Sequence, residues 1–248
     1  MKKIGIVGGI AWLSTVDYYY AALCRRSEER HIASKAPGVP STPEMSIESP
    51  DLNKVFASLG NDDDEQSWAK FDDYHRVALK RVEASGADSA IIASNTPHHR
   101  FASIIRGVEI PVISIVEAVA KESARIGARE VLILGTRPTM RSAVFREGFA
   151  KHGVEAAGPR DEAAQAMTAE LIFELQRGKT AGAAERLDKI ARMSFGQLRA
   201  QPAVSLACTE LPLAFRDHKT LATFKQDGIL YINSSVMHIN AAFDYAIS

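Results

Sequence analysis

One predicted strand in this sequence ends in polar side chains of the kind that carry out chemistry. The stretch "IIASNTPHH", residues 91–99, runs from isoleucines into Ser94, Asn95 and Thr96 before a proline. A hydroxyl can donate a proton, and backbone N–H groups where a strand turns into a helix bind carboxylates well. The stretch therefore predicts an anion-binding strand end with a serine at its head.

A second strand end repeats the pattern with a thiol in place of the hydroxyl. The stretch "VSLACTELP", residues 204–212, runs from an apolar segment into Cys208, Thr209 and Glu210, again with a proline beyond. A thiol can serve as acid or base in the cell, because its unperturbed pKa of about 8.5 lies close to cellular pH. This end therefore predicts a proton-transfer group beside further polar side chains.

The two ends together suit the inversion of a carbon stereocentre. That reaction needs a base on one face of the carbon and an acid on the other, and Ser94 and Cys208 would supply the two groups if they faced each other across a cleft. The residues alone leave a structural alternative open. Serine, asparagine and threonine often cap helices, and a single cysteine in an α/β core is commonly a small buried apolar residue.

Strands and helices alternate along the chain and would position these two ends. Continuous apolar runs predict strands at residues 3–7, 45–48, 89–94, 130–136, 203–208 and 228–233. Helical spacing of apolar residues predicts helices at residues 16–30, 71–86, 167–178 and 234–248. Residues 108–127 are predicted to form a strand that leads into a helix. Such alternation, with apolar strands, indicates parallel sheets covered on both faces.

The sequence also contains an internal echo. "IGIVGG" at residues 4–9 and "VLILGT" at residues 131–136 each place a glycine at the end of an apolar strand, and each precedes one of the two polar ends. We therefore expect the α/β class, with two pseudo-symmetric parallel-sheet α/β domains and the active site in the cleft between them. The expected domains are residues 1–106 plus 216–248, and residues 107–215. Ligands bind at the carboxyl edges of such sheets.

Composition excludes several classes of function. The chain has 248 residues, of which 46% are hydrophobic, and its 30 basic and 30 acidic side chains cancel. We therefore expect no nucleic-acid partner. No apolar run approaches the roughly 20 residues that span a bilayer, so we expect no membrane partner. The start "MKKIGIVGG" is interpreted as a strand and not a signal peptide. With two cysteines and no disulfide framework, the protein is expected to be cytoplasmic.

No metal site is predicted from the sequence. His98 and His99 are adjacent, so they cannot share one metal ion at helical spacing, and no cysteine lies near them in the sequence. The acidic run at residues 62–65 is interpreted as a solvated loop.

Several of these motifs, in order along nearly the whole chain, resemble the aspartate/glutamate racemase family. The motifs are "GGIAWLST" (8–15), "SNTPH" (94–98), "LGTRPTM" (134–140), "ACTELPL" (207–213) and "SSVMH" (234–238). The resemblance implies two pseudo-symmetric α/β domains with the site between them. It also implies catalysis without a cofactor, by two cysteines that act as the paired acid and base.

The resemblance assigns roles to individual residues of this chain. Cys208 matches the second catalytic cysteine, and Ser94 stands where the first would be; some members of the family carry a hydroxyl residue there. The implied substrate ligands are Trp12, Ser14, Ser49, Asn95, Thr96, Thr209, Glu210 and His238.

The chain departs from the family at the groups that would bind a side-chain carboxylate. The arginine-containing stretch found after the second strand of some aspartate racemases is replaced by "SIESPDLN", and their lysine near position 165 is absent from "EAAQAM". Arg137 in "GTRPTM" is our candidate for this role. The alternative is that Arg137 is a solvated loop arginine.

The leading hypothesis is an isomerase: a cofactor-independent racemase of aspartate, glutamate or both, which works by two-sided proton transfer. Its partner would be a dicarboxylic amino acid, and a homodimer is one candidate assembly. One alternative is a single-cysteine lyase of the same superfamily that decarboxylates a substituted malonate, because loss of CO₂ makes the carbanion and only one proton donor is then needed. The other is a ligand-binding homologue that has lost the chemistry.

Overall fold

The chain forms two compact units, each with its own sheet. The structure, a computed structural model, describes residues 1–40, 42–61, 64–196 and 203–248. Unit 1 comprises Met1–Ile113 and Ile239–Ser248, and unit 2 comprises Ser114–His238. Both units are α/β structures dominated by parallel strands, as the sequence predicts.

Unit 1 is built on four parallel strands in the order β2-β1-β3-β4. These are β1 (Ile4–Val7), β2 (Met45–Glu48), β3 (Ser89–Ile92) and β4 (Val112–Ile113). Strand β1 is central and pairs in parallel with both β2 and β3. In the register, Val7 lies beside Ile92, so β1 and β3 end together at the carboxyl edge of the sheet.

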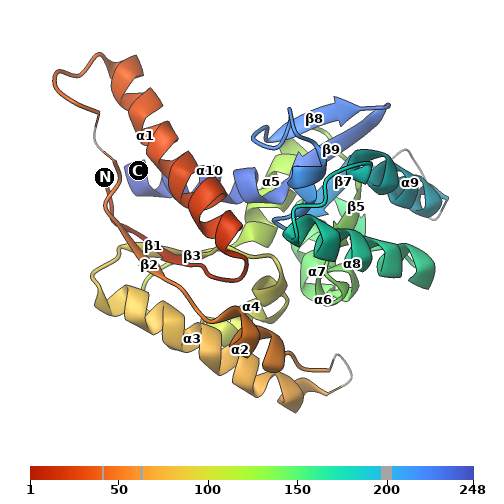
Figure 1. Ribbon diagram of the computed structural model, residues 1–248. Coiled ribbons are helices and arrows are strands. Elements are labelled where there is room, and N and C mark those ends of the chain that lie inside the picture. The colour runs from red at the N-terminus through yellow and green to blue at the C-terminus, as the bar shows by residue number, and fades with distance from the viewer. Residues whose placement is uncertain (41, 62–63, 197–202) are drawn as a thin grey trace. The chain divides into compact units, whose positions relative to one another are not determined.

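Helices cover both faces of the unit 1 sheet. Figure 1 shows α1 and α3 on opposite sides of the strands. The helices of this unit are α1 (Ala21–Ser34), α2 (Leu52–Ala57), α3 (Ala69–Ala84) and α4 (Phe101–Ile104), with 3-10 helices at Glu65–Trp68 and Thr96–Arg100. The predicted helix at residues 16–30 begins two residues earlier, as a π-helix at Ser14–Tyr20 that continues into α1. Of the acidic run, Asp62 and Asp63 lie outside the described residues, and Asp64 caps the helix Glu65–Trp68.

Unit 2 is built on five strands in the order β6-β5-β7-β9-β8. These are β5 (Glu130–Gly135), β6 (Glu155–Ala157), β7 (Ala203–Ala207), β8 (Thr223–Gln226) and β9 (Ile229–Asn233). All pairs are parallel except β8 with β9, which is antiparallel. The first three strands of each unit therefore follow one order, in which the first strand of the unit lies between the second and the third. This shared order is the structural counterpart of the internal echo in the sequence.

The sheet of unit 2 is buried on both faces. The helices are α5 (Ile115–Arg125), α6 (Arg137–Arg141), α7 (Ala143–Ala150), α8 (Glu162–Gln176) and α9 (Ala183–Phe195), with a 3-10 helix at Leu211–Ala214. Along β5, Leu132 and Leu134 pack into the cluster with α8 and α9, whereas Val131 and Ile133 pack into the cluster with α5 and α7. Successive side chains point to opposite faces, so both faces need apolar residues. This is why the strand sequences are continuously apolar.

The domain boundaries expected from the sequence need correction. Residues 216–238 were expected in the first domain but belong to unit 2, because β9 pairs with β7 along Ala203–Leu206. Residues 107–113 were expected in the second domain but belong to unit 1, because β4 pairs with β3. The last helix, α10 (Ser234–Ile247), begins in unit 2, and its part from Ile239 onward belongs to unit 1.

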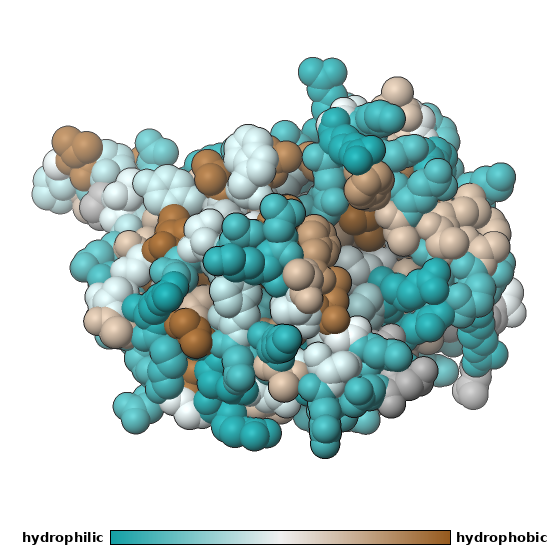
Figure 2. Space-filling model, turned by 60° about the horizontal axis from the view of Figure 1, so that its bottom comes forward, coloured by the Kyte–Doolittle hydropathy of each residue, from teal (hydrophilic) through white to brown (hydrophobic). Residues whose placement is uncertain are grey.

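Apolar surface does not gather into one area on the face in Figure 2, where hydrophobic residues lie among hydrophilic ones. Among the described residues, none of the helices is long and apolar enough to cross a bilayer.

A close backbone contact at the end of β5 generates the first prediction. A Cβ added at Gly135 would lie 2.4 Å from the carbonyl oxygen of Ala207, which a side chain cannot approach so closely. We expect Gly135→Ala to lower the free energy of unfolding by about 1–3 kcal/mol, because the two strands would have to move apart. Gly196→Ala is the control: nothing lies within 4 Å of the added atom, so its effect should stay within about 0.5 kcal/mol. Urea unfolding of the two variants measures both, and equal stabilities would contradict the prediction.

Candidate active site

The first polar strand end lies at the carboxyl edge of the unit 1 sheet. Ser94 follows β3, is 7% exposed, and is joined by the buried Asn95. The backbone turns sharply here, because the Ser94 N–H donates to the carbonyl oxygen of Ile92 at 2.7 Å. Thr96 then begins the 3-10 helix Thr96–Arg100, in which Pro97 occupies the first turn. Ser94, Asn95 and Thr96 therefore lie where the chain passes from β3 into the 3-10 helix.

His98 supports the backbone of this strand end. Its ring is fully buried and stacks on Phe101 at a centroid distance of 5.2 Å. Its Nδ1 lies 2.9 Å from the carbonyl oxygen of Ser94. A carbonyl oxygen only accepts, so Nδ1 carries the proton and donates it. That nitrogen therefore cannot take a proton from the Ser94 hydroxyl.

An ion pair that the sequence did not reveal anchors the same segment. The Arg100 guanidinium donates to both carboxylate oxygens of Asp72 on α3, with Nη2 2.9 Å from Oδ2, and its Nη1 lies 2.6 Å from Glu65 Oε2. Arg100 and Asp72 side chains are only 9% and 7% exposed. A buried ion pair is costly to break, so the helix after Ser94 is held firmly against α3.

Three more of the expected residues lie at this edge of unit 1. Ser14 is buried at the start of the π-helix, whereas Trp12 is 67% exposed. Ser49 follows β2, and its hydroxyl lies next to Gly9: a Cβ added at Gly9 would be 2.7 Å from Ser49 Oγ. The ends of β1, β2 and β3 and their following loops therefore form one group of polar and aromatic side chains.

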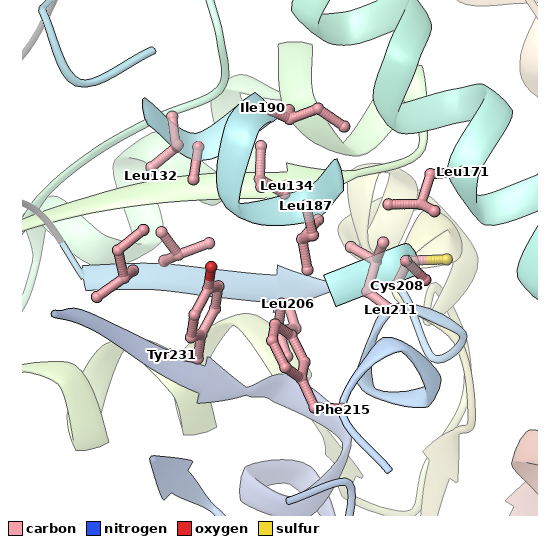
Figure 3. Packing of buried hydrophobic residues seen from close by; sticks show 14 of the residues in the cluster. Leu132, Leu134, Leu171, Leu187, Ile190, Leu206, Cys208, Leu211, Phe215 and Tyr231 are labelled. Carbon is pink, nitrogen blue, oxygen red and sulfur yellow. The ribbon is translucent and has the colours of Figure 1, made fainter. Parts of the chain in front are cut away.

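The second polar strand end lies at the carboxyl edge of the unit 2 sheet. Cys208 directly follows β7 and borders the apolar cluster beside Leu171 and Leu211 (Figure 3). Its thiol donates to Glu210 Oε2 at 2.9 Å, and the Thr209 hydroxyl donates to the same oxygen at 3.0 Å. All three side chains of this end are at most 6% exposed.

Burial and the neighbouring charge govern the protonation of this pair. Burial first, and then the charge and hydrogen bond of Glu210, raise the pKa of the Cys208 thiol well above its usual range. Backbone N–H groups of Glu210 and Thr209 oppose that shift. Burial also raises the pKa of Glu210, although the hydrogen bonds from Cys208 and Thr209 lower it. Two groups so close titrate as a unit, and the pair can hold one proton and one negative charge between sulfur and carboxylate.

Glu210 makes contacts within the chain that the sequence did not predict. The resemblance implied a substrate ligand; one carboxylate oxygen of Glu210 accepts from Cys208 and Thr209, and the role of Glu210 toward a substrate stays a prediction. The two-residue spacing in "CTE" was a signal for this contact, because a turn after the strand can bring the two side chains together. The arrangement gives the thiol a local proton acceptor.

Arg137 lies at the same edge of the sheet, and its guanidinium forms an ion pair with a carboxylate of the chain. It begins α6, one residue after the end of β5, its side chain is 49% exposed, and its Nη1 lies 3.8 Å from Glu162 Oε2. Glu162 also pairs with Arg141, whose Nε donates to the buried Gln165 at 2.9 Å. The expected role of Arg137 toward a substrate carboxylate stays a prediction.

The last of the expected residues is His238. His238 is fully buried on α10. Among the described residues, no group of three or more His, Cys, Asp or Glu side chains could hold a metal ion. The residues at the two strand ends are suited to moving protons and binding anions.

Comparison with known proteins gives a consistent result across the chain. The model of the family described as Asp/Glu/Hydantoin racemase matches residues 7–242. The crystal structure of an aspartate racemase homologue from Pyrococcus horikoshii OT3 is similar at a TM-score of 0.73 and 28% sequence identity, covering 100% of both chains. The fold is also shared with an aspartate racemase from Picrophilus torridus, with TM-score 0.72, 19% identity, and 99% and 94% of the two chains covered.

One curated relative matches over a shorter segment. The broad specificity amino-acid racemase RacX of Bacillus subtilis (strain 168) is 31% identical over 75 residues, which are 30% of this chain. The match spans only 33% of the length of that relative.

The contact between Cys208 and Glu210 generates the second prediction. Glu210→Gln removes the negative charge that raises the thiol pKa, so we expect the pKa of Cys208 to fall although burial still keeps it raised. Ultraviolet absorbance of the thiolate against pH, in a Cys24→Ser background, measures it. Glu174→Gln is the matched control in unit 2, because Glu174 pairs with Arg186 instead. A thiol pKa that is unchanged or higher in Glu210→Gln would contradict the assignment.

Proposed function

Because the chain belongs to the Asp/Glu/hydantoin racemase family, we propose that it is a cofactor-independent racemase acting on aspartate, glutamate or both. Cys208 and Ser94 exchange protons with the α-carbon from its two faces. One observation carries the proposal: a buried thiol at the end of a central strand donates to a buried carboxylate 2.9 Å away. A structural cysteine in a core gains nothing from a neighbouring buried charge, which costs free energy to desolvate.

In the proposed reaction Glu210 acts through Cys208. The carboxylate takes the thiol proton along their hydrogen bond, and the thiolate then removes the α-proton of the substrate. The carbanion forms beside anion-binding groups, for which we propose Asn95 and Thr96. Thr209 supports the pair itself, since its hydroxyl donates to Glu210.

Ser94 gives a proton to the opposite face of the carbanion and regains one from solvent, while Glu210 releases to solvent the proton that it took from Cys208, so that the enzyme returns to its starting state. A carbanion is a strong base, so a hydroxyl can protonate it. The reverse step is slower, because an alkoxide is far less stable than a thiolate. The enantiomers have equal free energy in water, so their kcat/KM values must be equal whatever groups do the work. A weak base on one side therefore slows both directions together.

The unequal pair leads to the third prediction, on isotope exchange. Cys208 can remove and return a proton on its own face without Ser94. We expect solvent deuterium to enter the α-position of one enantiomer faster than that enantiomer inverts, and Ser94→Cys to speed inversion. NMR of each enantiomer of aspartate and glutamate in D₂O, with wild type and Ser94→Cys, measures both rates. If neither protein exchanges an α-proton of any of these four substrates, the proposed function fails.

The two cysteines give the fourth prediction. Cys208→Ser should lower turnover by about 10²-fold or more, because it removes the proton-transfer group, while the unfolding transition is retained. Cys24→Ser is the matched control, since Cys24 lies in the helix α1 and not at a strand end. The assignment is wrong if both variants lose activity, or if neither does.

A further inference from the structure

The loop between β1 and the π-helix is held by two hydroxyl groups. The Ser14 hydroxyl donates to the carbonyl oxygen of Ala11 at 2.8 Å and reaches that of Ala93 at 3.3 Å. The Thr15 hydroxyl accepts from the N–H of Gly9 at 2.9 Å. The loop is thus tied both to its own following helix and to the end of β3.

The same loop contains a strained residue. Ala11 has a φ of 88°, in the region that favours glycine. Such a conformation costs about 1–3 kcal/mol and persists only where surrounding contacts impose it. A π-helix, itself uncommon and often found at functional sites, begins three residues later at Ser14. The bond from Ser14 to the Ala11 carbonyl is one contact that imposes the strained turn.

The bond to Ala93 acts directly on Ser94. The Ala93 carbonyl and the Ser94 N–H belong to one peptide plane, and that N–H is bound to Ile92 on the other side. Holding the carbonyl fixes the plane and therefore the direction in which Ser94 leaves the strand.

Ser14 cannot also serve as a donor to a substrate. A serine hydroxyl has one proton, and two carbonyl oxygens already compete for it. A substrate carboxylate needs donors, which this buried hydroxyl cannot supply while the loop is intact. We propose that Ser14 is a positioning residue that orients Ser94 and holds the strained loop, and that it is not a substrate ligand. The catalytic consequence rests on the proposed function; the structural consequence does not.

The chain offers an internal reporter of the loop. It contains two tryptophans: Trp12 lies in the loop and is 67% exposed, whereas Trp68 is 1% exposed in the core. In protein labelled with 5-fluorotryptophan, Ser14→Ala should shift the fluorine resonance of Trp12 and leave that of Trp68 unchanged. Trp12→Phe assigns the two resonances, and the Trp68 signal reports whether the core remains folded.

The position of Ser94 is measured without reference to activity. Hydrogen exchange of the Ser94 amide, followed by NMR, should become about tenfold faster in Ser14→Ala, because the peptide plane loses one of its two supports. Ser85→Ala is the control. It removes the same kind of bond, from Ser85 Oγ to the Val82 carbonyl at 2.6 Å, before β3 begins. It should change neither the Trp12 resonance nor Ser94 exchange.

The expected catalytic effect of Ser14→Ala is a lower kcat with little change in KM. A misplaced Ser94 should lower kcat for inversion by about tenfold or more, with KM changed by less than about threefold. A lost substrate ligand would instead raise KM. The proposal is overturned if Ser94 exchange and the Trp12 resonance are both unchanged in Ser14→Ala, or if KM rises while kcat is retained. If wild type itself shows no α-proton exchange, the proposed function fails, while the two NMR measurements still decide the role of Ser14.

Discussion

Burial of the sheets on both faces is the constraint on which the rest of this structure depends. In unit 2, alternate residues of β5 enter two separate apolar clusters, one on each face. Polar side chains are costly in such positions. The groups that can do chemistry therefore stand where strands end, with Ser94 after β3 and Cys208 after β7. The repeated strand order places each at the carboxyl edge of its own sheet.

The two strand ends manage burial in different ways. At Cys208, the groups removed from water are an ionisable pair, and their burial raises the pKa of both the thiol and Glu210. One proton shared between them satisfies both groups. At Ser94, the strand end is organised by the contact of the His98 ring with the Ser94 carbonyl and by the ion pair of Arg100 with Asp72. One end thus holds a buried ionisable pair, and the other a buried hydroxyl whose backbone is fixed by its neighbours.

In unit 1, the backbone on both sides of Ser94 is held by contacts with neighbouring helices. The segment after Ser94 is fixed to α3 through Arg100, and the segment before it to the π-helix through Ser14. Strain at Ala11 is balanced by these surrounding bonds. Such strain commonly gathers at functional sites, where the structure enforces one arrangement.

The sequence by itself determined most of the strands and the two polar strand ends, but not the short strands β6 and β8 or the helices α7 and α9. Continuous apolar runs, glycines and prolines are local features that can be read along the sequence. They were enough to predict the strands β1, β5 and β7, and the polar side chains of Ser94 and Cys208 that follow β3 and β7. The resemblance in motifs also indicated the family correctly.

Tertiary structure decided what depends on contacts between distant segments. Strand β9 belongs to unit 2 because it pairs with β7, and no local pattern states a pairing partner. The direction of the Ser14 hydroxyl toward Ala93, and of Arg100 toward Asp72, follows from packing across the sheet. Glu210 is the intermediate case. Its place beside Cys208 is local in sequence, but the burial that turns the two into one titrating pair comes from the elements folded around them.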